Sequence, residues 1–344
     1  MIYFNLLIIF LFIIFIHEFG HYFFARLFKV KVTDFSIGFG KVLISYYDKN
    51  HTNWKISLIP LGGYVKIKGL ESIFNNKPKT FNHNDSFEDI SLLKKIIILL
   101  GGSLFNIISS WIIIISIFFF IGITKYEPII GEVIKDSPAH INDLKNGDRI
   151  VKINDHKIDN FLDIGKFINK DEYVTIELLR GNSIITKNVR LNYNNELNKY
   201  FLGIRSNNKP NIIKYDFINS FIDSTYFIPT YYIQISKYIF NSYNSNTLSQ
   251  ELSGPIGIVK IADQLMLDKI IGILFMFISI SLFVAIFNLI PIPLLDGGHI
   301  LFFIIRRIFS NKLPQFIIKL YLAIGIAIIS FIFILITFND IFYK

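Results

Sequence analysis

The chain has 344 residues, of which 52% are hydrophobic and only 18% carry a charge, and its formal net charge is +9. Soluble globular domains usually contain about 25% charged residues, so this composition excludes a wholly soluble enzyme and a disordered or fibrous chain. The absence of cysteine excludes disulfides, thiolate metal ligands and cysteine nucleophiles. A positive charge is also typical of nucleic-acid-binding proteins. In a membrane protein, however, Lys and Arg collect in cytoplasmic loops, so we expect no nucleic-acid partner.

Four apolar runs are long enough to cross the hydrocarbon core of a bilayer, which takes about 20 helical residues. We expect transmembrane helices within residues 1–25, 96–123, 270–298 and 320–338. The first run has neither a basic segment before it nor a small-residue cleavage site, so we interpret it as a retained helix. The predicted fold class is a polytopic α-helical membrane protein.

The charges of the connecting segments predict the orientation of these helices. Residues 26–95 carry twelve basic and six acidic side chains, and the segment between the third and fourth runs carries four basic side chains and no acid. Basic loops stay in the cytoplasm. Both segments are therefore predicted to be cytoplasmic, with both termini and the region from about 124 to 269 on the outer side.

Three segments outside these runs have patterns of their own. Residues 54–68, within the 26–95 region, alternate like a β-hairpin and contain Pro60-Leu61-Gly62-Gly63. Residues 126–205 form short alternating runs separated by turn signals, which predicts a small β-rich domain. Residues 211–250 are dense in Tyr, Phe and Ile, which predicts packing helices or helices lying in the membrane interface.

The sharpest motif is His17-Glu18-Phe19-Gly20-His21, at the end of the first apolar run. Residues four apart share a helix face, so both imidazoles can bind one metal ion. Glu18 is offset by one position and can act on an attacking water molecule as a general base. The alternative is a pair of packing histidines, but ionisable groups in a membrane helix are costly and mark function by default.

A catalytic zinc ion usually has three protein ligands, so the chain must supply a third from elsewhere. Asp296 is the only acid in the apolar neighbourhood at the end of the third run, at a depth that matches His21. The alternative for Asp296 is a helix-ending Asp-Gly-Gly turn. Pro291 and Pro293 must break the helix just before it. His299 is a spare ligand candidate, for which we favour a supporting or structural role.

Together these motifs resemble the site-two protease family of intramembrane metalloproteases. Within that family they most resemble the bacterial proteases that regulate sigma-E. The likeness is carried by the His17–His21 motif and by further matching segments across both membrane halves, namely Asn288 to Gly298, Phe35 to Gly40, Ser57 to Lys66 and Leu252 to Ile258. The resemblance implies one zinc ion per chain with His17, His21 and Asp296 as ligands, and Glu18 as the catalytic residue.

The same resemblance implies a substrate-binding region. Its residues would hold an unwound substrate helix or pair with an extended substrate along a membrane-associated β-hairpin, and they are Asn288, Pro291, Pro293, Asn106, Gly62, Gly63 and Tyr64. The family's Gly-Gly-Pro-x-x-Asn element appears here as residues 101–106, with Ser103 in place of the usual proline. Asn106 is retained.

Residues 126–205 resemble a PDZ domain of bacterial proteases, in Ser137-Pro138-Ala139, in Asn146 to Asn154 and in Ile158. The related proteases have two such domains in tandem, whereas about 80 residues allow only one. We expect the domain either to bind peptides or to exclude bulky substrates.

The function implied by the resemblance is hydrolysis of peptide bonds within transmembrane segments of single-pass proteins, such as anti-sigma factors or signal-peptide remnants. The expected partners are these substrates, membrane lipid and an upstream site-one protease that cuts the same substrate. The expected location is the inner membrane of a bacterial cell, with the active site toward the cytoplasm and the PDZ domain and both termini on the periplasmic side. The alternatives are a catalytically silent PDZ-bearing adaptor, which should have lost Glu18 or Asp296, and a metal transporter, which more often shows internal repeats.

Overall fold

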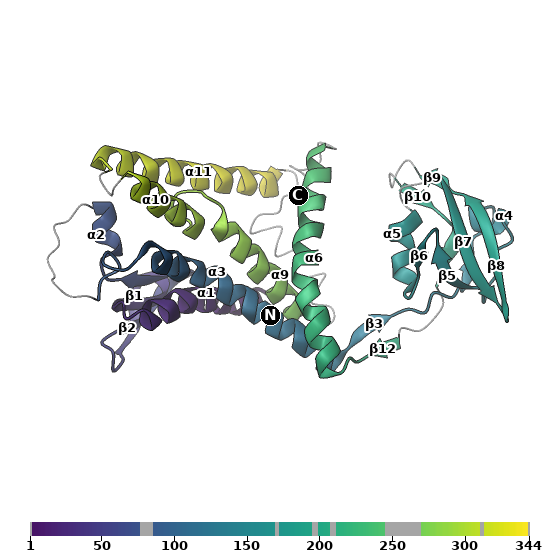
Figure 1. Cartoon of the computed structure of the whole chain (residues 1–344), viewed down its shortest axis with the longest axis horizontal. Coiled ribbons are helices and arrows are strands. Elements are labelled where there is room, and N and C mark those ends of the chain that lie inside the picture. The colour runs from purple at the N-terminus through teal and green to yellow at the C-terminus, as the bar shows by residue number, and fades with distance from the viewer. Residues whose placement is uncertain are drawn as a thin grey trace. The chain divides into compact units, whose positions relative to one another are not determined.

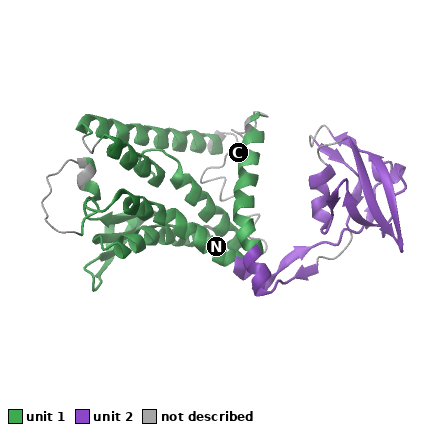
Figure 2. Ribbon diagram, viewed as in Figure 1, with its two compact units in different colours: residues 1–114, 223–344 green, residues 115–222 purple. Residues whose placement is uncertain are grey.

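The computed structural model describes residues 2–75, 85–168, 172–194, 199–206, 211–244, 270–309 and 313–342. The chain forms two compact units (Figure 2), one of Met1–Ile114 with Asp223–Lys344 and the other of Ile115–Ile222. The matching segment Leu252 to Ile258 and residues 245–250 of the aromatic stretch lie outside the described residues.

The first unit contains helices that are long and apolar enough to cross a membrane (Figure 1). They are α1 (Ile2–Leu27), α3 (Leu92–Ser116, which continues into the second unit as the π-helix Ile117–Ile121), α9 (Ile270–Leu289) and α11 (Gln315–Phe342). These four helices coincide with the four apolar runs. The expectation of four helices long and apolar enough to span a membrane is thereby confirmed.

The expected third span, 270–298, is wrong at its C-terminal end. Helix α9 ends at Leu289, and a separate helix, α10 (Asp296–Ile308), begins after the loop 290–295. Pro291 and Pro293 lie in this loop, where a proline has no N–H to continue the helical hydrogen bonds. Asp296 therefore lies on the first turn of α10 and not on a membrane span. Arg306 and Arg307, expected in a loop, form the last turn of α10.

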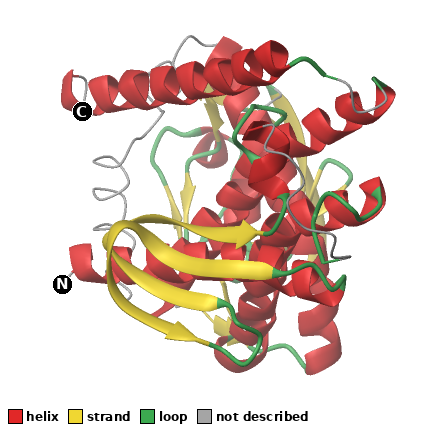
Figure 3. Cartoon of the chain, turned by 90° about the vertical axis from the view of Figure 1, so that its left-hand side faces the viewer, coloured by secondary structure: helices red, strands yellow, loops and turns green. Residues whose placement is uncertain are grey.

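A long hairpin follows α1 and consists of β1 (Val32–Tyr47) and β2 (Asn53–Ile67), followed by the short helix α2 (Leu70–Asn75). Residues 32–37 pair with 63–67 on one side and with 53–56 on the other, so the hairpin folds back into a small sheet that faces the viewer in Figure 3. Its outer half exposes large apolar side chains, namely Phe39, Val42, Leu43, Ile44, Tyr46, Tyr47, Ile56, Leu58 and Ile59. Soluble proteins rarely expose such a continuous apolar surface.

Two apolar clusters hold the first unit together. The first joins the end of α1 to the sheet, α3, α10 and α11, and contains Ala25, Val32, Phe87, Ile98, Phe302 and Ile318. The second packs α1 on α9, through Leu6, Ile9, Ile13, Met276 and Phe277. Both clusters flank the segment of α1 that carries His17 and His21.

The aromatic stretch 211–250 differs from the helices expected there. Residues Asn211–Ile213 form a strand, β12, and α6 is one helix over Phe217–Asn244. Tyr231 and Tyr232 of α6 donate hydrogen bonds to the carbonyl oxygens of Ser279 and Leu282 in α9, at 3.2 and 3.0 Å. This part of α6 is a helix that packs on a membrane helix.

The second unit is β-rich, as the pattern of 126–205 predicts. Its main antiparallel sheet has the order β6 (His156–Lys157), β5 (Arg149–Ile153), β7 (Tyr173–Arg180), β8 (Ser183–Arg190). Shorter pairs join β4 (Glu132–Val133) to β11 (Ile204–Arg205), β9 (Asn192–Asn194) to β10 (Lys199–Phe201) and β3 (Ile123–Lys125) to β12. Two short helices, α4 (Pro138–Ile141) and α5 (Ile164–Ile168), and the 3-10 turn Phe161–Asp163 complete the unit. It has a buried core of its own.

Candidate metal centre

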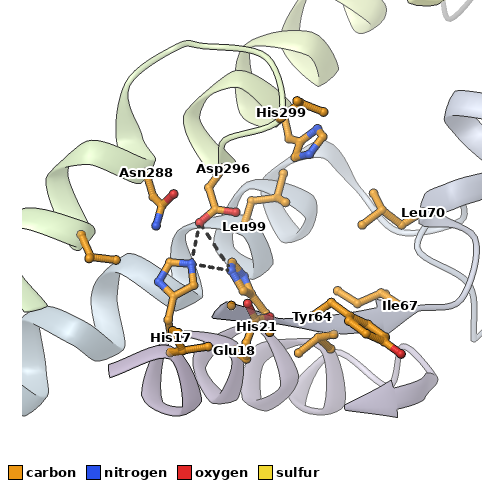
Figure 4. Close-up of a pocket in the computed structure, with 16 residues that line it drawn as sticks. His17, Glu18, His21, Tyr64, Ile67, Leu70, Leu99, Asn288, Asp296 and His299 are labelled. Carbon is orange, nitrogen blue, oxygen red and sulfur yellow. Dashed lines mark hydrogen bonds and ion pairs between the residues drawn. The ribbon is translucent and has the colours of Figure 1, made fainter. Parts of the chain in front are cut away.

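Three side chains from two helices converge on one point (Figure 4). His17 and His21 lie one turn apart on α1, with their Nε2 atoms 3.3 Å from each other. Oδ2 of Asp296 lies 3.2 Å from Nε2 of His17 and 3.4 Å from Nε2 of His21. Ligands about 2.0–2.1 Å from a tetrahedral zinc ion lie about 3.3–3.4 Å from one another. The spacing of the three atoms therefore fits a zinc ion.

The hydrogen bonds around the cluster also fit a cation. Nδ1 of His21 donates to the carbonyl oxygen of Ile98 at 2.8 Å, so in the neutral ring Nε2 is the nitrogen with a free lone pair. Oδ2 of Asp296 is buried and accepts no hydrogen bond from the described residues. With both rings neutral and protonated on Nδ1, two nitrogen lone pairs and a carboxylate oxygen face one another, an arrangement that a metal ion stabilises.

Asn106 of α3 lies beside the His17 imidazole, on the side away from Asp296. Its side-chain amide is 3.3 Å from Nδ1 of His17, and the residue is fully buried. Its Oδ1 has no donor among the described residues, so with the amide turned by 180° it can accept the Nδ1 proton of His17. Metal-bound histidines usually donate their second ring N–H in this way. Asn106 is not among the residues that line the cavity described below, and its role in substrate binding stays a prediction.

Glycines allow α1 and α3 to meet at the cluster. A Cβ atom on Gly20 would lie 2.1 Å from the carbonyl oxygen of Gly101, and one on Gly102 would lie 2.6 Å from Nε2 of His21. Both distances are far below an ordinary carbon contact, so the two helix backbones touch here. Sequence reasoning named Gly101 and Gly102 only as part of a family element and missed this role.

Ser103, which replaces the proline of the family pattern, has a hydrogen-bond partner in α9. Its Oγ donates to the carbonyl oxygen of Ala285 at 2.9 Å, and Ser281 of α9 donates in return to the carbonyl oxygen of Asn106 at 3.1 Å. These two bonds fix α9 against the part of α3 that supports His17.

The cluster opens into a cavity of about 410 Å³. Glu18 lines this cavity beside the hairpin, since a Cβ atom on Gly63 would lie 3.1 Å from its Cγ. The predicted substrate residues that also line it are Gly62, Gly63, Tyr64 and Asn288. Pro291 and Pro293 do not, and Leu294 takes their place. That Pro291 and Pro293 help to hold substrate stays a prediction.

His299 also lines the cavity but stands apart from the three converging atoms. Its ring contacts the ring of Phe74 in α2, with centroids 5.1 Å apart. Among the described residues, His17, His21 and Asp296 form the one group of His, Asp and Glu side chains whose ligand atoms lie close enough to share an ion. This agrees with the supporting or structural role that we favoured for His299.

Comparison with known proteins identifies the family. Residues 5–332 match the family model described as "Peptidase family M50". The chain belongs to this family. The match includes the whole His17–His21 motif and Asp296, and it confirms the resemblance to site-two proteases.

Relatives of this M50 peptidase match it over nearly its whole length. A protein of Rickettsia conorii is 34% identical over 96% of the chain and 95% of its own length. A protein of Campylobacter jejuni is 35% identical (96% and 90%), and one of Helicobacter pylori strain J99 is 33% identical (96% and 96%). All three carry the name "Putative zinc metalloprotease".

One solved structure matches part of the chain, the PDZ domain of an SdrC-like protein of Listeria monocytogenes. Its sequence is 20% identical, the match covers 24% of this chain and 90% of the Listeria chain, and the TM-score is 0.22. This score is too low to establish the fold of the matching segment.

Proposed function

We propose that this M50 peptidase is an intramembrane zinc metalloprotease that hydrolyses peptide bonds within transmembrane segments of single-pass proteins. The observation that carries the proposal is the convergence of His17, His21 and Asp296 with Glu18 on one cavity. The two histidines and Glu18 lie on a helix apolar enough to span a membrane. A soluble peptidase has no need to build its site on such a helix.

One zinc ion per chain would be held by Nε2 of His17, Nε2 of His21 and Oδ2 of Asp296. Bound there, it supplies a Lewis acid that activates a water molecule and polarises the peptide carbonyl. The chain's own contribution is to orient these three donors. Ile98 and Asn106 fix the two imidazole rings from behind, and the start of α10 presents the carboxylate.

Glu18 is proposed as the general base. It follows His17 directly on α1, so its carboxylate reaches the same cavity from a neighbouring direction of the helix. From there it takes a proton from the attacking water and passes that proton to the leaving amine nitrogen. Both transfers need one carboxylate beside the reacting carbon and the departing nitrogen.

The hairpin offers a binding surface for an unwound substrate. Residues 63–67 are paired along one side only among the described strands, and Gly63, Tyr64 and Val65 line the cavity. An extended peptide can add to such an edge and satisfy its backbone hydrogen bonds there. This matters in a membrane, where an unpaired backbone group costs several kcal/mol, on the order of a full hydrogen bond. Asn288 faces the same cavity and is a further polar contact.

The location follows from the charge distribution and the resemblance. We place the chain in the inner membrane of a bacterial cell, in contact with lipid, with the metal centre toward the cytoplasm and the second unit and both termini outside. The second unit is proposed to be a PDZ domain. Anti-sigma factors and signal-peptide remnants are the proposed substrates, and a site-one protease that trims the outer part of a substrate is the proposed partner.

The test is cleavage of a single-pass substrate by purified protein in detergent or nanodiscs. Wild type should cleave it, and Glu18→Gln should retain zinc while the rate falls by about 10²–10⁴-fold, the usual contribution of a general base. Glu132→Gln, in an exposed strand of the second unit, is the matched control and should keep the wild-type rate. Equal rates for wild type and Glu18→Gln would contradict the proposal. A silent adaptor or a transporter predicts no cleavage by any of the three proteins.

A further inference from the structure

Helix α11 makes few contacts for a membrane helix. Only 6% of its most apolar window is buried, compared with 39% for α9. Along residues 315–338 the buried positions are Ile318 and Gly325. The buried positions of α11 thus lie at its two ends, with Ile318 and Gly325 toward the metal centre and Asn339 and Asp340 at the C-terminal end.

The contacts on the side of the metal centre reach the loop that precedes Asp296 and the first turn of α10 that follows it. The hydroxyl group of Tyr321 donates a 2.7 Å hydrogen bond to the carbonyl oxygen of Gly298, in the first turn of α10. A Cβ atom on Gly325 would lie 2.5 Å from both the Cβ atom and the carbonyl oxygen of Pro293. Tyr321 and Gly325 are four residues apart, so one face of α11 contacts both the loop and the first turn of α10.

The loop itself is tightly folded and strained. Gly297 and Gly298 touch its backbone, because their Cβ atoms would lie 2.1 Å from the carbonyl oxygen of Leu289 and 2.0 Å from that of Ile292. Leu294 has a φ of 80°, in the left-handed region. A branched side chain at such a φ is a conformation that persists only where the surroundings impose it. Leu294 lies two residues before Asp296, so relaxation of Leu294 would turn the carboxylate away.

We propose that Gly325 and Tyr321 of α11 are positioning residues for Asp296. They clamp the loop 290–295 and the first turn of α10, so that the strained backbone at Leu294 is maintained and the carboxylate stays directed at His17 and His21. This inference rests on the proposed function, since it assigns a task within the same metal centre. It gives the sparsely packed helix α11 a function beyond crossing the membrane.

The test measures metal binding by the full chain in detergent, independently of proteolysis. Zinc affinity is determined by competition with a chelator, and the geometry of the site by the d–d absorption of the cobalt(II)-substituted protein. The variants are Gly325→Val, which drives a side chain into Pro293, and Tyr321→Phe, which removes only the hydroxyl group. The matched controls are Ala323→Val, an exposed position on the same helix, and Tyr226→Phe, an exposed tyrosine of α6.

Gly325→Val should weaken zinc binding by about 10–100-fold, the usual effect of losing a group that orients a ligand. It should also change the tetrahedral cobalt spectrum. Tyr321→Phe should weaken binding by about fivefold, the effect of one hydrogen bond, and both controls should bind like wild type. If Gly325→Val does not fold, Tyr321→Phe against Tyr226→Phe decides the question alone.

The double variant Gly325→Val/Asp296→Ala separates positioning from general damage. If Gly325 acts through Asp296, the double variant should bind zinc no more weakly than Asp296→Ala alone. Additive losses, or wild-type affinity and spectrum in Gly325→Val and Tyr321→Phe, would overturn the inference. That result would leave the proposed function standing, provided that wild type binds zinc and Asp296→Ala weakens it. Failure of wild type to bind zinc would instead overturn both.

Discussion

Gly102 of α3 lies directly against the imidazole of His21. A Cβ atom there would be 2.6 Å from Nε2 of His21 and 2.7 Å from Nε2 of His17. These are the two nitrogens proposed to bind zinc. The position can therefore take no side chain unless the proposed ligand atoms move.

Replacing Gly102 by alanine should weaken zinc binding at least about tenfold, because outer-shell changes that displace a ligand cost about 10–100-fold. The loss should occur although alanine favours a helix over glycine by about 1 kcal/mol. Zinc affinity by chelator competition measures the effect. Gly165→Ala in α5, where a Cβ atom meets nothing within 4 Å, is the control. Wild-type zinc affinity in Gly102→Ala would show that α3 is not in contact with the ligands.

Asn106→Ala should weaken zinc binding by about 10–100-fold, since His17 loses the group that fixes its ring. Ser109→Ala is a suitable control, because the Ser109 hydroxyl donates to the backbone carbonyl of Asn106 at 3.0 Å and its loss leaves the Asn106 amide in place. If Asn106 instead contacted substrate, as the sequence suggested, Asn106→Ala would keep its zinc and raise KM.

The sequence predicts the local parts of this site and misses those made by tertiary contacts. His17 and His21 could be paired from helical periodicity alone, and Asp296 from its depth and charge. The structure brings these three residues together. That Asp296 begins a separate helix was not foreseen, because Pro291 and Pro293 show where a helix ends but not where the next begins.

Close backbone contacts have no sequence signal. Gly102, Gly325 and Tyr321 are ordinary residues of apolar helices, and only the crossing of α3 and α11 with their neighbours gives them a role. The same holds for Asn106, whose side chain could have been directed at substrate or at His17.

Residues 126–210 of the second unit can be removed between β3 and β12, because these strands are antiparallel, with Lys125 opposite Asn211. Residues 126–210 can be replaced by Asn-Gly, a two-residue turn suited to such a pair. If these residues exclude bulky substrates, the shortened enzyme should cleave proteins with untrimmed outer domains, and its rate on short-tailed substrates should change little.

A peptide-recruiting domain predicts slower cleavage of short-tailed substrates after the same deletion. The loss should appear as a higher KM, because recruitment stabilises the bound substrate and the transition state equally. Cleavage rates of intact and shortened enzyme on both substrate types separate the two roles. Loss of cleavage of short-tailed substrates while zinc stays bound would count against exclusion.

Asp148 should make the second unit sensitive to acid. Burial alone would raise the pKa of Asp148, but hydrogen bonds from Arg180 and from the backbone N–H of Lys145 outweigh it and lower that pKa. The ionised form therefore stabilises the fold above the unfolded pKa of about 3.9, and this stability is lost as the pH falls through the folded value.

The corresponding measurement is urea unfolding of the fragment 122–214 between pH 2 and 6. Its free energy of unfolding should fall below about pH 4, by up to about 1.4 kcal/mol per pH unit for the proton that Asp148 takes up. Asp148→Asn should be less stable at pH 6 and should show a shallower fall. Identical slopes for the two proteins would mean that Asp148 does not contribute.

The most direct test of the metal centre is the zinc content of four purified variants beside wild type. Wild type should hold one zinc ion per chain, at about 2.0–2.2 Å from nitrogen and oxygen ligands by X-ray absorption. His17→Ala, His21→Ala and Asp296→Ala should each lose it under chelator competition, whereas His299→Ala, which removes a histidine from the same cavity, should keep it. Retention of zinc by Asp296→Ala together with its loss from His299→Ala would contradict the account.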